Sequence, residues 1–174
     1  IIDLIKLLQK MGAIIELGVD RKIRIEGVKK LNGATHRIIP DRNEAVSFAV
    51  MALATGGKIF IKEARQSHLI NFLNAVRRLD GDFKITPEGI EFFRNNKFFN
   101  PLTAETDTHP GFMTDWQQPF CILLTQAQGK SIIHETVYEE RFAYTQDLRR
   151  MGAKIKLSAE CLGSLPCRFS GKGY

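Results

Sequence analysis

The sequence lacks any long apolar run, and it has little cysteine, histidine or tryptophan. No stretch approaches the roughly 18–20 apolar residues of a membrane-spanning helix, and no signal-peptide pattern is present, so we expect no membrane partner. The three cysteines form no CxxC pair and the four histidines are dispersed, a pattern without ligand spacing for a metal. We therefore expect neither metal nor cofactor.

The cysteines also indicate a compartment. Cys121 lies within an apolar run and is expected in the core, whereas Cys161 and Cys167 lie close enough in sequence to pair or to share a metal. Reduced thiols in a cytoplasmic protein are the interpretation that we favour, because the number of cysteines is odd and small.

A strong charge of one sign is missing too. The net charge of +6 is compatible with an anionic ligand, but the lysines and arginines are scattered. No basic run is interleaved with aromatic residues, so we expect no nucleic-acid partner. With 44% hydrophobic and 25% charged residues, the 174 residues have the composition of one or two globular domains.

The apolar periodicity predicts alternating helices and strands. Helices are expected over residues 1–11, 45–54, 68–79, 120–126 and 146–151, and strands over 14–17, 22–26, 35–39, 58–62, 83–85, 90–93, 131–136 and 154–157. The helix over 45–54 is apolar nearly all round, which predicts burial on most of its faces.

The sequence of helices and strands repeats. Gly57-Lys58 recurs as Gly129-Lys130 at a period of 72 residues, and aligning Gly81 with Gly152 gives 71. Residues 8–13 (LQKMGA) match residues 148–153 (LRRMGA) as the tail of an earlier copy. The unit is β-α-β-α-β-β with about 70 residues, which predicts a mixed α/β (α+β) fold rather than a solenoid.

Asp115 stands where a loop enters a helix. Pro110 and Gly111 favour a turn before it, and Pro119, which fits only a first helical turn, places the helix start between residues 115 and 118. The helix dipole would favour the charged carboxylate by roughly 0.3–1 kcal/mol. Asp115 is then either a helix cap, which the spacing alone favours, or a base that faces a ligand. Asp41 holds the same place one repeat earlier, and two such helix starts that converge would form an anion site.

Four stretches together resemble the enolpyruvyl transferases, and in particular the members that act on UDP-N-acetylglucosamine: residues 37–45, 109–115, 134–142 and 148–153. The resemblance covers the chain with order and spacing intact. It implies an inside-out α/β barrel with two domains, each built from three β-α-β-α-β-β units, and substrates bound between them. Residues 1–38 would close one domain, and residues 39–174 would supply two of the three units of the other, about 39–104 and 105–174.

The resemblance also implies a reaction. The enolpyruvyl group of phosphoenolpyruvate moves to the 3-hydroxyl of UDP-N-acetylglucosamine and phosphate leaves, the first committed step of peptidoglycan synthesis. Such an addition–elimination needs a base, an acid and cations for the phosphate and carboxylate groups. Asp115 matches the family's proposed base and Arg141 an arginine of the active-site cleft. The family's general acid has no counterpart here, so the chain should hold part of the site, need the rest of the same enzyme, and be inactive alone.

Other matched positions imply substrate contacts. Val137 matches a backbone contact to the nucleotide-sugar, Tyr138 an aromatic that packs on the uracil ring, and Asp41 and Arg42 a helix entry near the ligand. Each has a structural alternative: Val137 as a strand residue, Tyr138 as an edge aromatic, and Asp41 with Arg42 as a capping pair. For Arg141 the alternatives are a solvated loop charge or a partner of Glu139.

Two other functions compete with this one. A transferase of the same fold that accepts shikimate 3-phosphate would share the chemistry, and it would not bind a uridine nucleotide. A non-catalytic binding module would keep the fold without turnover. The stretches over 109–115 and 135–142 favour the nucleotide-sugar substrate, and the presence of Asp115 favours an enzyme.

Overall fold

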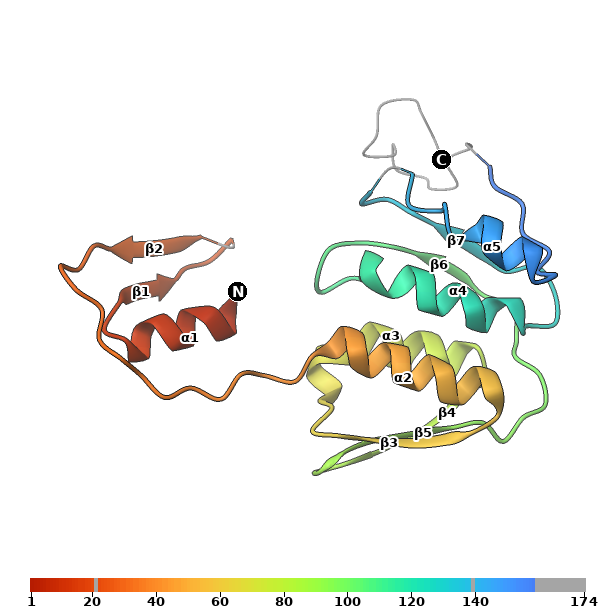
Figure 1. The fold of residues 1–174 in the computed structure, drawn as a ribbon, viewed down its shortest axis with the longest axis horizontal. Coiled ribbons are helices and arrows are strands. Elements are labelled where there is room, and N and C mark those ends of the chain that lie inside the picture. Colours follow the sequence, from red (N-terminus) through yellow and green to blue (C-terminus); the bar gives the residue numbers. More distant parts are fainter. Residues whose placement is uncertain (21, 139, 159–174) are drawn as a thin grey trace. The chain divides into compact units, whose positions relative to one another are not determined.

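A computed structural model describes residues 1–20, 22–138 and 140–158 (Figure 1). The chain divides into two units, one formed by residues 1–40 and the other beginning at Asp41. In the described part of the chain, no helix is both long enough and apolar enough to cross a membrane.

The first unit is a helix followed by a β-hairpin. Helix α1 (Ile2–Lys10) leads into the antiparallel strands β1 (Ile14–Leu17) and β2 (Ile23–Glu26). Ile5 of α1 and Ile15 of β1 are buried, while most other apolar side chains of this unit are exposed. The core of this unit is thus one side chain from α1 and one from β1, while β2 contributes no buried side chain.

The strand predicted over 35–39 is wrong, because the backbone there bonds to α1 instead of a neighbouring strand. The ring Nε2 of His36 lies 3.0 Å from Asp3 Oδ1, and the N–H of Ile39 donates to Asp3 Oδ2 at 3.5 Å. The N–H of Asn32 donates to the Met11 carbonyl at the end of the helix. An alternating apolar pattern needs a partner edge to become a strand, and this segment meets a helix.

The second unit starts with two helices on one face of a sheet. Its elements are α2 (Arg42–Thr55), β3 (Lys58–Lys62), α3 (Gln66–Arg78), β4 (Asp82–Thr86) and β5 (Gly89–Phe93). The strands are antiparallel in the order β3-β5-β4, and α2 and α3 cover the same face (Figure 1). Val46, Leu53, Phe72 and Phe92 are fully buried between these layers.

A second set of elements follows on the other side of α2. It comprises β6 (Thr103–Glu105), the 3₁₀ helix η1 (Thr114–Trp116), α4 (Gln117–Thr125), β7 (Ile132–His134) and α5 (Thr145–Arg150). Strands β6 and β7 are parallel, with α4 in the connection between them. Because α4 packs on α2, helix α2 lies between the sheet and α4 (Figure 1). Its burial is less complete than predicted, since Phe48 and Met51 remain about half exposed.

The strand predicted over 154–157 is not formed with any partner in residues 140–158 or elsewhere in the described chain. Its residues nevertheless keep an alternation of half-buried and exposed side chains as far as Lys156.

The helix ends show that the repeat is structural. Gly12 follows α1 and Gly152 follows α5, and both have a φ of +99°, in the region that favours glycine. In each case the N–H of the residue after the glycine donates to the carbonyl five residues back, at 2.9 Å. The matched sequences LQKMGA and LRRMGA therefore fold alike.

At the end of α3 the same geometry falls one residue earlier than predicted. The N–H of Gly81 donates to the Val76 carbonyl at 2.9 Å, which makes Asp80, with a φ of +67°, the counterpart of Gly12 and Gly152. The predicted alignment of Gly81 with Gly152 is wrong by one residue. Aligning Asp80 with Gly152 gives 72 residues, the same period as Gly57 and Gly129.

The two copies are joined at their helix entrances. The indole Nε1 of Trp116, just before α4, donates to Asn43 Oδ1 in the first turn of α2 at 3.0 Å. The Trp116 ring is 2% exposed and lies edge-on to Phe72 of α3 and to Phe112. This contact brings the two equivalent helix starts side by side.

Replacing Gly81 by alanine should destabilise the second unit by about 1–3 kcal/mol, because the added Cβ would lie 2.9 Å from Val76 Cγ1 inside the core. Urea unfolding followed by the fluorescence of Trp116, the single tryptophan, measures this. Gly33→Ala, where the Cβ meets open space, is the control and should not lower the midpoint. Equal effects of both substitutions would contradict the steric explanation.

Replacing Asn43 by alanine should cost about 1–3 kcal/mol, because it leaves the buried Trp116 N–H without its acceptor. Denaturation followed by circular dichroism measures this decrease in the free energy of unfolding. Asn43→Asp keeps an oxygen acceptor in the first turn of α2, where an acid is also favoured, and should retain most of the stability. A similar loss in both variants would refute the role of this hydrogen bond.

Candidate functional site

Asp115 lies in η1, at the end of a tight loop. The N–H of Asp107 donates to the Phe112 carbonyl and that of Gly111 to the Thr108 carbonyl, both at 2.7 Å. A side chain at position 111 would overlap Asp107, so this turn requires glycine there. The loop delivers Asp115 to the surface, while its neighbours on both sides are buried.

The interpretation of Asp115 as a helix cap is wrong. Trp116 occupies the N-cap position of α4, and no side chain caps that helix. The carboxylate instead accepts a hydrogen bond from Arg141 Nη2 at 2.8 Å, and its side chain is 43% exposed. An acid in this setting remains accessible to a ligand.

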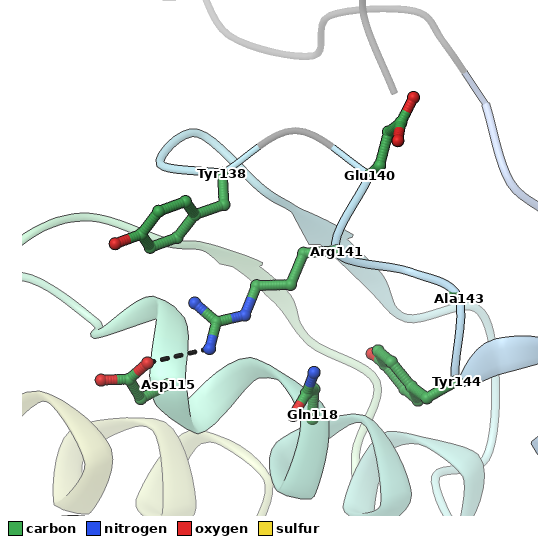
Figure 2. Close-up of a pocket in the computed structure, with 7 residues that line it drawn as sticks. All are labelled: Asp115, Gln118, Tyr138, Glu140, Arg141, Ala143 and Tyr144. Carbon is green, nitrogen blue, oxygen red and sulfur yellow. Dashed lines mark hydrogen bonds and ion pairs between the residues drawn. The ribbon is translucent and has the colours of Figure 1, made fainter.

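Arg141 connects three parts of the site. Besides its ion pair with Asp115, its Nη1 donates to Thr114 Oγ1 at 3.0 Å, and its guanidinium carbon lies 5.1 Å from the centre of the Tyr138 ring. Figure 2 shows the guanidinium between the Asp115 carboxylate and the Tyr138 ring. Arg141 is thus not a solvated loop charge; Glu139, its alternative partner, lies outside the described residues.

Val137 and Tyr138 follow β7 rather than continuing it, which corrects the predicted strand to Ile132–His134. Both backbone N–H groups donate to Glu135 Oε1, at 2.9 Å from Val137 and 3.1 Å from Tyr138. The Tyr138 side chain is 57% exposed. Its ring is therefore available on the surface above Arg141.

Glu135 is the residue that sequence reasoning missed. Only 7% exposed, it accepts four hydrogen bonds: Oε1 from the Thr106 hydroxyl and the two N–H groups just named, and Oε2 from the Thr114 hydroxyl at 2.8 Å. The prediction of one strand over 131–136 treated Glu135 as an ordinary strand residue. An acid next to the apolar residues of that strand could have indicated the site, because a buried carboxylate requires specific hydrogen-bond partners.

An open pocket of about 520 Å³ lies beside Asp115. Asp115, Arg141 and Tyr138 form one side, and the remaining lining residues are Gln118, Glu140, Ala143 and Tyr144 (Figure 2). Burial raises the pKa of the Tyr144 phenol, and the neighbouring Cys121 thiol raises it further. The pocket therefore offers an exposed carboxylate and a fixed cation to a polar ligand, whereas the Tyr144 hydroxyl is itself buried.

Asp41 and Arg42 lie outside this pocket. Asp41 caps α2, because its Oδ1 accepts from the Asn43 N–H at 2.7 Å. Arg42 Nη1 lies 3.2 Å from His109 Nδ1. Burial lowers the pKa of His68, and so do the positive charges that surround it, those of Arg65, Arg42 and His109. The start of α2 therefore carries both a cation, Arg42, and two acids, Asp41 and Glu44.

The cysteines and the acidic and histidine side chains of the described residues were also candidates for binding a metal. Cys121 is buried and unpaired, as expected for a core residue, and burial raises the pKa of its thiol. Cys161 and Cys167 lie outside the described residues. Among residues 1–20, 22–138 and 140–158, no group of three or more histidine, cysteine or acidic side chains could hold a metal ion.

The chain has close relatives of known name. It is 49% identical over 174 residues to the "UDP-N-acetylglucosamine 1-carboxyvinyltransferase" of Protochlamydia amoebophila, which covers 100% of this chain and 37% of that protein. The protein of the same name from Chlamydia pneumoniae is 46% identical over 170 residues, 98% of this chain and 37% of its own length. The chain therefore spans little more than a third of these curated relatives.

Solved structures resemble the fold. The enolpyruvyl transferase NikO from Streptomyces tendae matches with a TM-score of 0.72 and 22% identity, over 85% of this chain and 36% of that one. EPSP synthase from Acinetobacter baumannii matches with a TM-score of 0.53 and 13% identity, over 90% of this chain and 37% of that one. The predicted α/β fold, the inside-out barrel of these enzymes, is confirmed.

The family is established over nearly the whole chain. A family model described as EPSP synthase (3-phosphoshikimate 1-carboxyvinyltransferase) matches residues 1–171. The four stretches that resemble enolpyruvyl transferases all fall within this match, and so does the pocket around Asp115. The chain belongs to the enolpyruvyl transferase family of EPSP synthase.

Proposed function

We propose that the chain is part of an enzyme that transfers the enolpyruvyl group of phosphoenolpyruvate to the 3-hydroxyl of UDP-N-acetylglucosamine. The observation that carries this proposal is the exposed Asp115 carboxylate, held by Arg141 at the edge of a pocket. The 49% identity to a relative named for this activity supports the choice of substrate. The reaction opens peptidoglycan synthesis, and the cytoplasm is the location that accords with its substrates.

The chemistry assigns a role to each charge. The sugar hydroxyl oxygen bonds to C2 of phosphoenolpyruvate while a base takes the hydroxyl proton and an acid protonates C3. The C2–phosphate oxygen bond then breaks and C3 returns a proton, which restores the double bond. Asp115 is the base for the hydroxyl, because its carboxylate is held 2.8 Å from Arg141 Nη2 and is still 43% exposed to a ligand. No described residue is assigned as the acid.

Neighbouring residues would orient the nucleotide-sugar. Tyr138 offers an exposed ring on which the uracil can pack. Since the Val137 N–H is bonded to Glu135, its backbone contact to the ligand would use the carbonyl oxygen. Arg42 lies in the first turn of α2, where its charge and the helix dipole would favour an anionic group of the substrate. Asp41 acts on that helix start as its cap.

The domain arrangement belongs to the same proposal. Residues 1–38 complete one domain, and residues 39–174 form two of the three repeat units of the other, about 39–104 and 105–174. The 72-residue period supports this, and so do the exposed apolar side chains of Phe48, Met51 and Ile122 on the paired helices α2 and α4. A third unit would cover them. The rest of the enzyme is then needed to complete the site.

A chimaeric enzyme tests the function. In it, this chain replaces the matching segment of the Protochlamydia amoebophila relative, and phosphate release is measured with phosphoenolpyruvate and UDP-N-acetylglucosamine. We expect turnover by the chimaera and none by the 174 residues alone. Asp115→Asn keeps the shape and removes the base, and it should lower kcat by about 10²–10⁴-fold.

Two results would contradict the proposal. Turnover with shikimate 3-phosphate instead of the nucleotide-sugar would assign the other substrate class. Binding of the nucleotide-sugar with a kcat that Asp115→Asn leaves unchanged would remove Asp115 from the chemistry. Gln118→Glu, at another lining residue, is the matched control for a change at the pocket surface and should retain turnover within about tenfold.

A further inference from the structure

Glu135 is a buried acid that does not line the pocket. Its carboxylate is 7% exposed and its oxygens accept hydrogen bonds from two hydroxyls and two backbone N–H groups. Removing a carboxylate from water is costly, and even a well-bonded buried charge adds little net stability. The benefit of this arrangement therefore lies in the geometry that it fixes.

One branch of the network runs from Glu135 to Asp115. The Thr114 hydroxyl has a single proton, which it donates to Glu135 Oε2 at 2.8 Å. Its oxygen is then free to accept from Arg141 Nη1 at 3.0 Å, and Arg141 Nη2 holds Asp115 Oδ1 at 2.8 Å. The direction of the bonds follows from the donors: the guanidinium can only donate, so the Thr114 oxygen accepts from it and the Thr114 proton goes to Glu135.

The other branch fixes the backbone that carries the arginine. Glu135 Oε1 accepts from the N–H groups of Val137 and Tyr138, a few residues before Arg141. It also accepts from the Thr106 hydroxyl at 2.9 Å, which ties the segment to the end of β6. Hydrogen bonds to one carboxylate thus hold the main chain before Arg141 directly and the guanidinium group through Thr114.

We propose that Glu135 is a positioning residue for the transfer, which orients Arg141 and Asp115 through the Thr114 hydroxyl. This inference rests on the proposed function of Asp115. Glu135 touches no reacting atom; it acts by holding the hydroxyl of Thr114 so that Arg141 keeps the base in one position.

Glu135→Gln separates this role from a general role in folding. The amide oxygen can replace Oε1, where three donors converge, and this leaves the NH₂ group facing Thr114. Thr114 Oγ1 then meets two donors and its own proton loses its acceptor. In the chimaeric enzyme we expect kcat to fall about 10–100-fold with KM for the nucleotide-sugar changed far less, and the unfolding midpoint to remain close to that of the parent.

Thr114 variants test the link itself. Thr114→Val removes the hydroxyl and should lower kcat as much as Glu135→Gln does. Thr114→Ser keeps the hydroxyl and should have a kcat close to that of the parent. Adding Glu135→Gln to Thr114→Val should cause no further loss of kcat, because the link is already broken. Thr55→Val removes a hydroxyl that donates only to backbone carbonyls of α2, away from this network, and should leave kcat within about threefold of the parent.

The outcomes separate the two proposals. Losses that multiply in the double variant, or full kcat in Glu135→Gln, would overturn the positioning role while the function stands. A parent chimaera without turnover would overturn the proposed function. If Glu135→Gln does not fold, the comparison of Thr114→Val with Thr114→Ser decides: equal kcat in both excludes the link.

Discussion

The contact between Asn43 and Trp116 is the constraint on which the site depends. It ties the first turn of α2 to η1, and the indole is closed in by the rings of Phe72 and Phe112. Because the aromatic side chain occupies the interior, the preceding residue is directed outward, and that residue is Asp115. The exposure of the carboxylate is thus a result of core packing.

The site places two exposed side chains on a rigid, hydrogen-bonded support. Thr114, Glu135 and the backbone of residues 135–138 are buried or bonded to one another, so their positions are fixed before any ligand arrives. Tyr138 and Asp115 are exposed to solvent, and each meets Arg141. Binding energy can therefore be directed to orientation rather than to ordering the scaffold.

The sequence predicted the regular elements better than the segments whose partners are distant. The spacing of apolar residues located the five α-helices of the described chain but not the 3₁₀ helix η1. The LQKMGA and LRRMGA matches predicted a shared helix end that the backbone bonds bear out. Periodicity carried no information on which edge residues 35–39 would meet. It also could not reveal that Asp80 adopts the left-handed conformation that glycine has in the other two copies. Family motifs pointed to Asp115 and Arg141, but the buried Glu135 became visible only with its four donors in place.

The capture of the Val137 and Tyr138 N–H groups by Glu135 has a consequence for selectivity. Their main-chain donors point into the protein, so neither N–H is left to bind a ligand, and the charged groups beside them are the Asp115 carboxylate and the Arg141 guanidinium. Hydroxyl or amide hydrogens of a ligand are therefore complementary to the Asp115 side of this edge, and anionic oxygens to the Arg141 side. The hidden Glu135 carboxylate thereby leaves the side chains alone to sort the polar groups of a ligand at this edge.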